Sequence, residues 1–170
     1  SWERLMKEGS VTYPCKSPNQ LGEEIVFGDK FPTKNGKGKF VAASLTSPNE
    51  IPDNDYSMIL TTGRQLEHWH TGSMTRKASN LDAIEPEPSV SLSPIDIDQN
   101  NLKPGELIKV STRRGSIKIR VRQDSAIPKG VIFIPFCYNE AAANILTNPA
   151  LDPYGKIPEF KYCAARIEQL

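Results

Sequence analysis

The chain has 170 residues, the size of one ordinary domain, so one main hydrophobic core is expected. Hydrophobic residues make up 38% and charged residues 24%, which is typical of a soluble globular domain and excludes a membrane-embedded composition. Because 21 Lys and Arg offset 20 Asp and Glu, the formal net charge is only +1, and net charge gives no support for a nucleic-acid-binding or membrane-surface protein.

The N-terminal third of the chain is unevenly patterned. A short amphipathic start at residues 2–7 is followed by two possible strands, at residues 24–27 and 39–43. Between them lies Asn35-Gly36, a strong turn signal because both residues tolerate positive φ. Residues 46–55 are polar and contain two prolines, which predicts a linker. We therefore expect residues 1–55 to be a lead-in segment and linker from a preceding domain, and residues 56–170 to form the main domain.

Strand patterns dominate the main domain. Residues 56–61 form a short apolar strand, and residues 106–122 alternate apolar and polar side chains on both sides of Arg114-Gly115, which predicts a hairpin with one solvated face. The run at 131–135 is continuously apolar, as in a buried central strand. Residues 139–146 predict a helix because they include three consecutive alanines, and residues 160–167 predict the last strand.

A small turn pattern occurs twice. Leu102-Lys103-Pro104-Gly105 precedes one predicted strand and Ile127-Pro128-Lys129-Gly130 precedes another, which suggests a pseudo-twofold duplication. The main domain holds about six short strands, with one or two helices, at regular spacing. This spacing favours a mainly β fold, and a closed barrel over an open sheet.

A ligand-binding composition follows the first strand of the main domain, in the segment TTGRQLEHWHTGSMTR. Glycines let backbone N–H groups approach an anion, Arg64 can hold a phosphate through two parallel hydrogen bonds, and Trp69 offers a flat face. These features suit a nucleotide-like ligand. The composition leaves an alternative open, in which Trp69 is a core residue and Arg64 a surface charge.

The two histidines, His68 and His70, would point to the same side of an extended strand. No third histidine or nearby cysteine completes a tetrahedral metal site, so hydrogen bonding is the expected role of the two histidines.

The three cysteines, Cys15, Cys137 and Cys163, are far apart and form no C-x-x-C pair, which argues against a disulfide framework or a zinc site. A reducing, cytoplasmic location is favoured.

Other functional patterns are weak. Basic residues line the predicted hairpin without interleaved aromatic residues, so a solvated or subunit-facing surface is favoured over a nucleic-acid ribbon. Cys137 and Cys163 lie in or beside apolar strands, where a thiol usually packs inertly. The sequence contains no nucleophile elbow, P-loop or G-x-G-x-x-G. No stretch approaches the roughly 18 apolar residues of a membrane-spanning helix.

Two long segments resemble a known family. TTGRQLEHWHTGSMTRKASNLDAIEPEP and FIPFCYNEAAANILTNPALDPYGKIPEFKYCAARIE resemble the C-terminal domain of molybdopterin oxidoreductases of the dimethyl-sulfoxide-reductase family, and the formate dehydrogenase α subunit in particular. ERLMKEGSVTYPC and FPTKNGKGKF resemble the segment that leads into that domain, so the resemblance covers nearly the whole chain. It implies a mainly β fold, a six-stranded double-psi β-barrel with short flanking helices.

The resemblance also implies a cofactor, bis(molybdopterin guanine dinucleotide) with molybdenum or tungsten, whose metal ligand and neighbouring four-iron, four-sulfur cluster belong to upstream domains. It places no catalytic residue and no metal ligand in this chain. The implied cofactor contacts are a continuous loop and three later residues: Thr62, Gly63, Arg64, Gln65, Leu66, Glu67, His68, Trp69, His70, Thr71, Phe136, Asn144 and Lys161.

The implied activity is that of a larger enzyme, which oxidises formate to carbon dioxide and passes electrons to an acceptor. No segment here matches the metal-binding and cluster-binding motifs, so the chain is expected to be an inactive fragment whose partners are upstream domains of the same polypeptide. Neither nucleic-acid binding nor membrane insertion by this segment is expected. Two alternatives remain open: the same domain of a nitrate reductase, which shares HWHTGSMTR, and a free-standing β-barrel binding module without redox activity.

Overall fold

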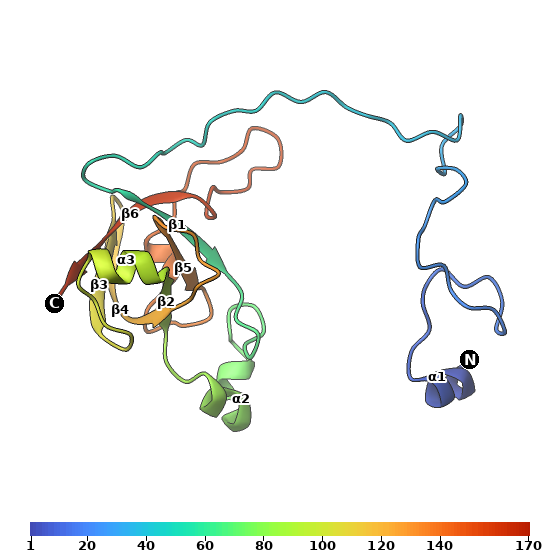
Figure 1. The fold of residues 1–170 in the computed structure, drawn as a ribbon, viewed down its shortest axis with the longest axis horizontal. Helices are drawn as coiled ribbons and strands as arrows, with labels where there is room; N and C mark the ends of the chain where they lie inside the picture. Colours follow the sequence, from blue (N-terminus) through green and yellow to red (C-terminus); the bar gives the residue numbers. More distant parts are fainter. The chain divides into compact units, whose positions relative to one another are not determined.

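The computed structural model describes residues 1–170, which divide into two compact units, Ser1–Leu45 and Thr46–Leu170 (Figure 1). The first unit contains one helix, α1 (Trp2–Glu8), whose N-cap is Ser1. The strands expected at 24–27 and 39–43 are absent, so that prediction was wrong, although a turn does form at Gly36, with φ of 71°. No residue of this unit is buried. An isolated pair of strands is only marginally stable in water, and the two strands expected here would have no hydrophobic core to pack against.

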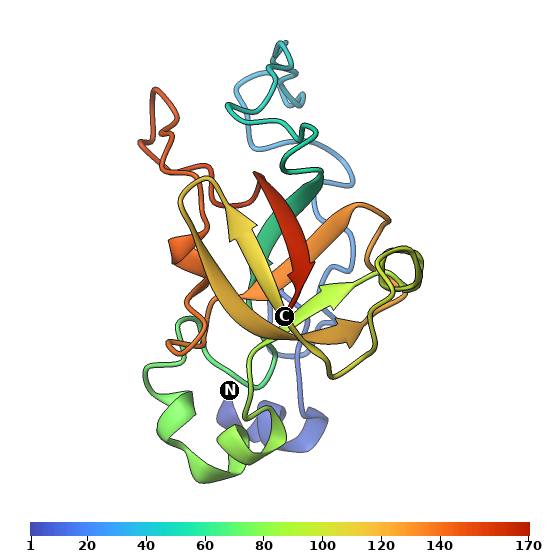
Figure 2. The same cartoon turned by 90° about the vertical axis from the view of Figure 1, so that its left-hand side faces the viewer.

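The second unit is a closed six-stranded barrel (Figure 2). Its strands are β1 (Met58–Gly63), β2 (Ser89–Leu92), β3 (Leu107–Thr112), β4 (Gly115–Gln123), β5 (Val131–Pro135) and β6 (Cys163–Gln169). Around the barrel the order is β1-β5-β2-β4-β3-β6. Closure leaves no exposed sheet edge. The prediction of a mainly β, six-stranded barrel with short helices is confirmed.

The strand pairing contains an internal repeat. Strand β1 is parallel to β5 and β2 is parallel to β4, while the other four pairs are antiparallel. Strands β1 and β2 flank β5, and strands β4 and β5 flank β2, so two psi motifs interlock. The pairing relates β1 to β4, β2 to β5 and β3 to β6, so the two repeated turns, which enter β3 and β5, do not occupy equivalent places in this repeat. Both turns have a glycine at positive φ, 85° at Gly105 and 77° at Gly130. Glu106 N–H bonds to Lys103 O (3.0 Å) and Val131 N–H to Pro128 O (3.1 Å), so each glycine takes the third position of a four-residue turn.

The core fills the barrel interior with alternate side chains. On β4, Ile117, Ile119 and Val121 are buried and the basic residues between them point outward, as the predicted hairpin requires. Strand β5 lies between β1 and β2, and Ile132 and Ile134 are fully buried. The predicted buried central strand is therefore confirmed.

Short helices connect the strands: η1 (Thr75–Lys77), α2 (Ser79–Ile84), α3 (Pro94–Gln99) and η2 (Ala143–Ile145). None has the length and apolar character needed to cross a bilayer. The α-helix predicted at 139–146 was wrong, because only η2 forms there. Ala141 and Ala143 are both buried, and residues two apart on an α-helix point in nearly opposite directions. Packing thus overrides the helix propensity of alanine.

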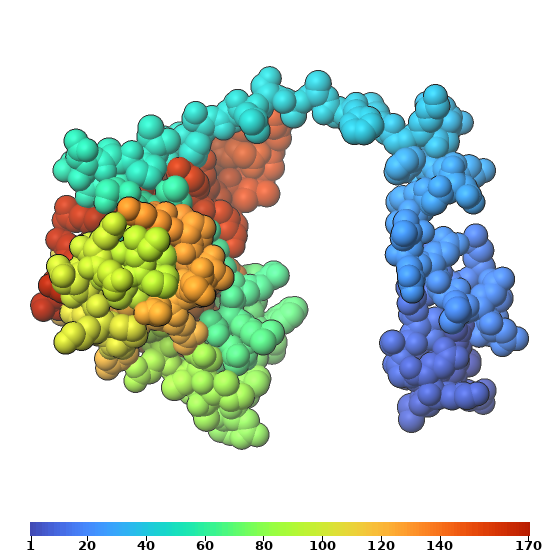
Figure 3. Space-filling model, in the orientation of Figure 1, coloured from blue at the N-terminus to red at the C-terminus, as the bar shows by residue number.

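The segment predicted as a linker, residues 46–55, lies on the surface of the second unit beside the C-terminal strand (Figure 3). Asn49 N–H donates to both carboxylate oxygens of Glu159, at 3.1 and 3.0 Å. Glu50 accepts hydrogen bonds from Arg113 and Arg114, and Asp53 also pairs with Arg113. The barrel unit therefore begins at Thr46 in the structure, while the functional boundary at residue 55 stays a prediction.

The Glu50 carboxylate is expected to make the stability of this unit pH-dependent. Burial alone raises the pKa of Glu50, but hydrogen bonds from Arg114, Arg113 and the Ala164 amide outweigh burial and lower the pKa. A lowered folded-state pKa contributes stability above the unfolded pKa, and that contribution is lost as pH falls through the folded pKa. Glu50→Gln should reduce the free energy of unfolding at pH 7 by about 1.5–3 kcal/mol, with a smaller difference near pH 3. Urea unfolding at both pH values measures this.

A matched control is Glu87→Gln, because Glu87 also pairs with an arginine, Arg120, but its side chain is 64% exposed. Exposed pairs contribute little, so the control should lose less than about 1 kcal/mol at either pH. An equal loss for Glu50→Gln at pH 7 and pH 3 would show that its charge is not what stabilises the segment.

Candidate functional site

Parallel pairing brings two distant segments to one rim of the barrel. Gly63 at the end of β1 lies opposite Pro135 at the end of β5. Two long connections leave from there: the β1–β2 excursion, residues 64–88, and the β5–β6 excursion, residues 136–162. Phe136 N–H donates to Gly63 O (3.1 Å), so the excursions start side by side. Ligand sites often occupy the carboxyl ends of parallel strands at such crossover points.

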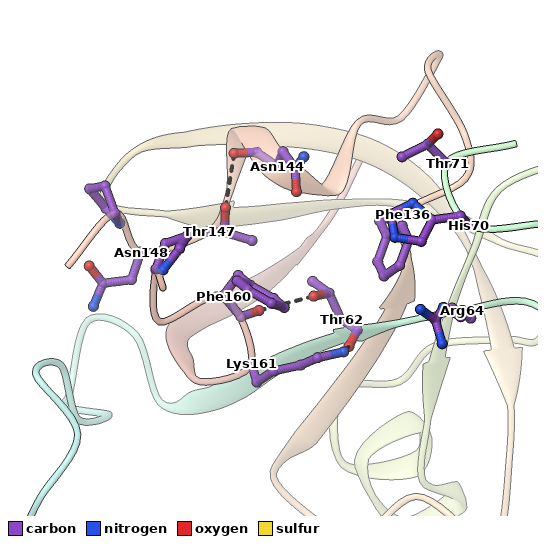
Figure 4. Close-up of a pocket in the computed structure, with 12 residues that line it drawn as sticks. Thr62, Arg64, His70, Thr71, Phe136, Asn144, Thr147, Asn148, Phe160 and Lys161 are labelled. Carbon is purple, nitrogen blue, oxygen red and sulfur yellow. Dashed lines mark hydrogen bonds between the residues drawn. The ribbon is translucent and has the colours of Figure 1, made fainter. Parts of the chain in front are cut away.

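A cavity of about 890 Å³ lies between the two excursions (Figure 4). Its size is within the range of small-molecule and cofactor sites. The walls come from the end of β1 and from both excursions: Thr62, Arg64, His70, Thr71, Phe136, Asn144, Thr147, Asn148, Pro149, Pro158, Phe160 and Lys161. Seven of these residues were predicted cofactor contacts: Thr62, Arg64, His70, Thr71, Phe136, Asn144 and Lys161.

The cavity wall is positively charged. It carries two cations, Arg64 and Lys161, and no carboxylate. The Arg64 side chain is exposed and makes no hydrogen bond or ion pair within residues 1–170. The Lys161 ammonium donates one hydrogen bond to Thr62 O and lies 5.9 Å from the Phe136 ring centre and 5.5 Å from that of Phe160. The site therefore favours an anion, although the whole chain is nearly neutral.

Other polar side chains of the cavity also have no partner within the chain. The side chains of His70, Thr71 and Asn144 have no hydrogen-bond partner within the chain, and Asn144 can both donate and accept. The His70 ring lies 5.3 Å from the Phe136 ring, and the two ring planes are inclined by 60°, so the rings form a partly apolar corner of the cavity. Together these groups suit a ligand with planar rings, ring amides and negative charge.

Other cavity residues stabilise the cavity wall through hydrogen bonds to neighbouring segments. Thr62 Oγ1 donates to Phe160 O (3.0 Å), and Thr147 Oγ1 donates to Asn144 O (3.2 Å), as the dashed lines in Figure 4 show. Asn148 Nδ2 donates to Glu159 (3.1 Å). The sequence reasoning missed five wall residues: Thr147, Asn148, Pro149, Pro158 and Phe160. The available signal was the second family-resembling segment, which contains all five residues in or beside its proline-rich stretch.

Six predicted contacts do not line the cavity: Gly63, Gln65, Leu66, Glu67, His68 and Trp69. Gln65 Nε2 donates to Glu67 (2.6 Å), and this bond lowers the pKa of Glu67. Leu66 is 95% exposed and Trp69 is 67% exposed, so the alternative in which Trp69 is a core residue was wrong. The two histidines do not share a side, because the chain turns between Gln65 and His68 and His70 has a φ of 51°.

The basic hairpin is largely neutralised. Arg120 pairs with Glu87 (2.8 Å), Arg122 with Glu85 (2.5 Å) and Lys109 with Glu168 (3.4 Å). Arg113 and Arg114 hold Glu50. Most of these cations therefore already have carboxylate partners, and the surface does not form a free basic ribbon.

The two buried thiols are not activated. Burial raises the pKa of Cys137 and of Cys163, which keeps both protonated at neutral pH. Within residues 1–170, no three or more His, Cys, Asp or Glu side chains are grouped to hold a metal ion. The barrel rim thus offers a binding surface built from cations, amides and rings.

Comparison with known proteins gives the family context. A family model described as "Molydopterin dinucleotide binding domain" matches residues 58–164, which run from the start of β1 into β6. The chain is 44% identical over all 170 residues to F420-dependent formate dehydrogenase subunit alpha of Methanocaldococcus jannaschii, and 41% identical to F420-dependent formate dehydrogenase 1 subunit alpha of Methanococcus maripaludis. It spans 25% of the length of each relative.

A similar fold occurs in acetylene hydratase from Pelobacter acetylenicus, with a TM-score of 0.62 and 23% sequence identity. The match covers 68% of this chain and 19% of that protein. At this identity the likeness concerns the fold.

Proposed function

Because the chain belongs to the molybdopterin dinucleotide binding domain family, we propose that its barrel encloses part of a bis(molybdopterin guanine dinucleotide) in a formate dehydrogenase α subunit. Identity above 40% over the whole chain to two formate dehydrogenase alpha subunits supports this assignment. The chain spans only a quarter of their length, so formate oxidation requires the rest of the polypeptide. In this proposal residues 1–55 lead in from the preceding domain and residues 56–170 form the cofactor-binding barrel.

The observation that carries the proposal is a cavity with two cations and no carboxylate between the excursions of two parallel strands. The donor set fits the cofactor. A guanidinium without an internal partner, at Arg64, suits a pyrophosphate through two parallel hydrogen bonds, and Lys161 adds a point charge. Asn144 complements a ring amide, and the Phe136 and His70 rings offer flat surfaces.

The six predicted contacts outside the cavity are proposed to have different roles. Gln65, Leu66, Glu67 and Trp69 are proposed to face the dinucleotide outside this cavity, where upstream domains complete the site. Gly63 is buried and its carbonyl oxygen already accepts from Phe136 N–H, so it is proposed to shape the start of the loop and not to contact the ligand. His68 is not proposed as a direct contact, because both of its ring nitrogens already have partners within the chain. When bound, the molybdenum or tungsten cofactor supplies the redox chemistry. This domain supplies orientation, charge neutralisation and part of the enclosure.

The test uses the intact polypeptide that contains this domain, purified without oxygen. We expect it to release pterin and guanine nucleotide on acid treatment and to reduce a dye with formate as the electron donor. F420 is included as a second acceptor because both relatives are named for it. Turnover of nitrate without turnover of formate would reassign the domain to a nitrate reductase. A protein that contains no pterin would contradict the proposal and favour a binding module without redox activity.

A further inference from the structure

His68 lies behind the cavity wall rather than in it. Its side chain is 2% exposed, and its Nε2 atom lies 2.8 Å from Glu85 O. A carbonyl oxygen only accepts hydrogen bonds, so Nε2 carries a proton and donates it. The same oxygen accepts from the hydroxyl of the buried Tyr138 (3.0 Å). Glu85 near the end of the β1–β2 excursion is therefore held by two buried donors.

The second nitrogen of His68 reaches the middle of the same excursion. Nδ1 lies 3.3 Å from Thr75 Oγ1, and that oxygen accepts a hydrogen bond from Trp69 N–H (3.0 Å). A threonine hydroxyl can donate as well as accept, so the Thr75 hydroxyl can donate to Nδ1 of a ring that carries its proton on Nε2. One imidazole thus connects residues 69, 75 and 85, which are spread over the whole excursion.

The cluster also connects the two excursions. The ring of Tyr138, from the β5–β6 excursion, lies edge-on to His68, with centroids 5.6 Å apart. The Arg76 guanidinium lies 4.8 Å from the Tyr138 ring centre and pairs with Asp82 and Glu140, each at 2.5 Å. The two excursions that form the cavity are therefore joined behind it by one buried tyrosine, which makes an edge-to-face contact with His68 and a cation–π contact with Arg76.

The turn at residues 70–72, which carries two of the cavity residues, packs against the cluster of His68, Tyr138 and Arg76. His70 and Thr71 line the cavity, and the next residue, Gly72, is buried with a φ of 74°. A Cβ atom at Gly72 would lie 2.6 Å from Cys137 O, so the turn is packed against the other excursion without spare room. The left-handed conformation of His70, at φ 51°, is uncommon for a residue other than glycine and needs support from its surroundings.

We propose that His68 is a positioning residue, which bonds to Thr75 and Glu85 and thereby holds His70 and Thr71 toward the cofactor without touching the cofactor itself. The proposal rests on the proposed function for the identity of the ligand, but its first consequence is a property of the cofactor-free protein. Loss of the two imidazole hydrogen bonds should loosen residues 69–85 locally and leave the barrel core unchanged.

The experiment compares His68→Phe, which keeps a ring but loses both hydrogen bonds, with His68→Gln, which keeps a side-chain N–H to donate to Glu85 O. Lys118→Ala, at an exposed position on β4, is the control. The intact polypeptide is produced in cells unable to make molybdopterin, and amide hydrogen exchange is followed by mass spectrometry. Exchange across residues 69–85 should become about tenfold faster in His68→Phe, be largely restored in His68→Gln, and be unchanged in peptides of β5 in every variant.

The second measurement is the pterin content of the same variants made in cells that supply the cofactor. It should fall severalfold in His68→Phe and recover in His68→Gln. Unchanged exchange together with lost pterin would mean that His68 contacts the cofactor directly, which overturns the proposal. Faster exchange throughout the barrel, or no change in either measurement, overturns it as well. If the parent protein itself contains no pterin, the proposed function fails, while exchange in the cofactor-free protein still decides the role of His68.

A second variant covers the case in which His68→Phe does not fold. Tyr138→Phe removes only the hydroxyl that shares Glu85 O and keeps the ring between His68 and Arg76. Exchange near residue 85 should then increase by a few-fold, less than for His68→Phe. Exchange identical to that of the parent protein would show that the cluster does not hold the excursion.

Discussion

Arg64→Glu in the intact polypeptide is expected to lower its affinity for the pterin dinucleotide by roughly 100-fold or more. Arg64 is the cavity cation whose side chain has no partner within the chain, so a ligand phosphate is free to take both of its parallel N–H groups. Loss of charge-assisted hydrogen bonds costs about 1.5–3 kcal/mol each, and a carboxylate beside a phosphate adds repulsion. The measurement is the fluorescence of oxidised pterin released from purified protein, per mole of polypeptide.

Two further variants isolate the cause. Arg120→Glu makes the same charge change on the outer face of β4, away from the cavity, and should leave the pterin content unchanged. Arg64→Lys keeps the charge but loses the planar fork, so an intermediate content is expected. If Arg64→Glu retains as much pterin as Arg120→Glu, the phosphate does not bind at Arg64 and the proposed orientation of the cofactor is incorrect.

Ile132→Ala is expected to reduce the free energy of unfolding of the barrel unit by about 2–5 kcal/mol. Ile132 is fully buried on β5 and lies opposite Leu60 of β1 and Leu92 of β2, which are also fully buried. Truncation removes apolar contacts on both sides of the strand and leaves a cavity that three β-strands cannot easily close. Urea unfolding of the 170-residue chain, followed by circular dichroism, measures the change.

The control for this prediction is Ile95→Ala on α3, where the isoleucine is 52% exposed. A change of about 0.5 kcal/mol or less is typical of surface substitutions, and we expect one of that size. Similar losses for the two variants would mean that β5 is not the centre of the cooperative core. A change in the denaturant dependence, rather than in the midpoint, would indicate that unfolding is not two-state.

Local sequence patterns correctly predicted the strands that show either a clear alternation of apolar and polar residues or a continuous apolar run. Buried apolar residues alternate with other residues at Ile108 and Val110 of β3 and along β4, and β5 is apolar throughout, so their type and approximate bounds were correct. Strand β2, only four residues long, was not located, and its length gives too short a pattern to detect. The alanine-rich stretch failed as a helix because Ala141 and Ala143 both pack into the core.

The amino-acid sequence by itself determined the chemistry of the site, because a guanidinium, an ammonium, an amide and aromatic rings are present whatever the fold, and their motifs identify the family. Tertiary structure decided which of them meet. Residues 64 and 136 are far apart along the chain and become neighbours only because β1 and β5 pair in parallel. His68 and His70 are two residues apart, yet one is buried with both ring nitrogens bonded and the other faces the cavity. Burial and hydrogen-bond partners come from residues distant in the chain, so local sequence spacing does not specify them.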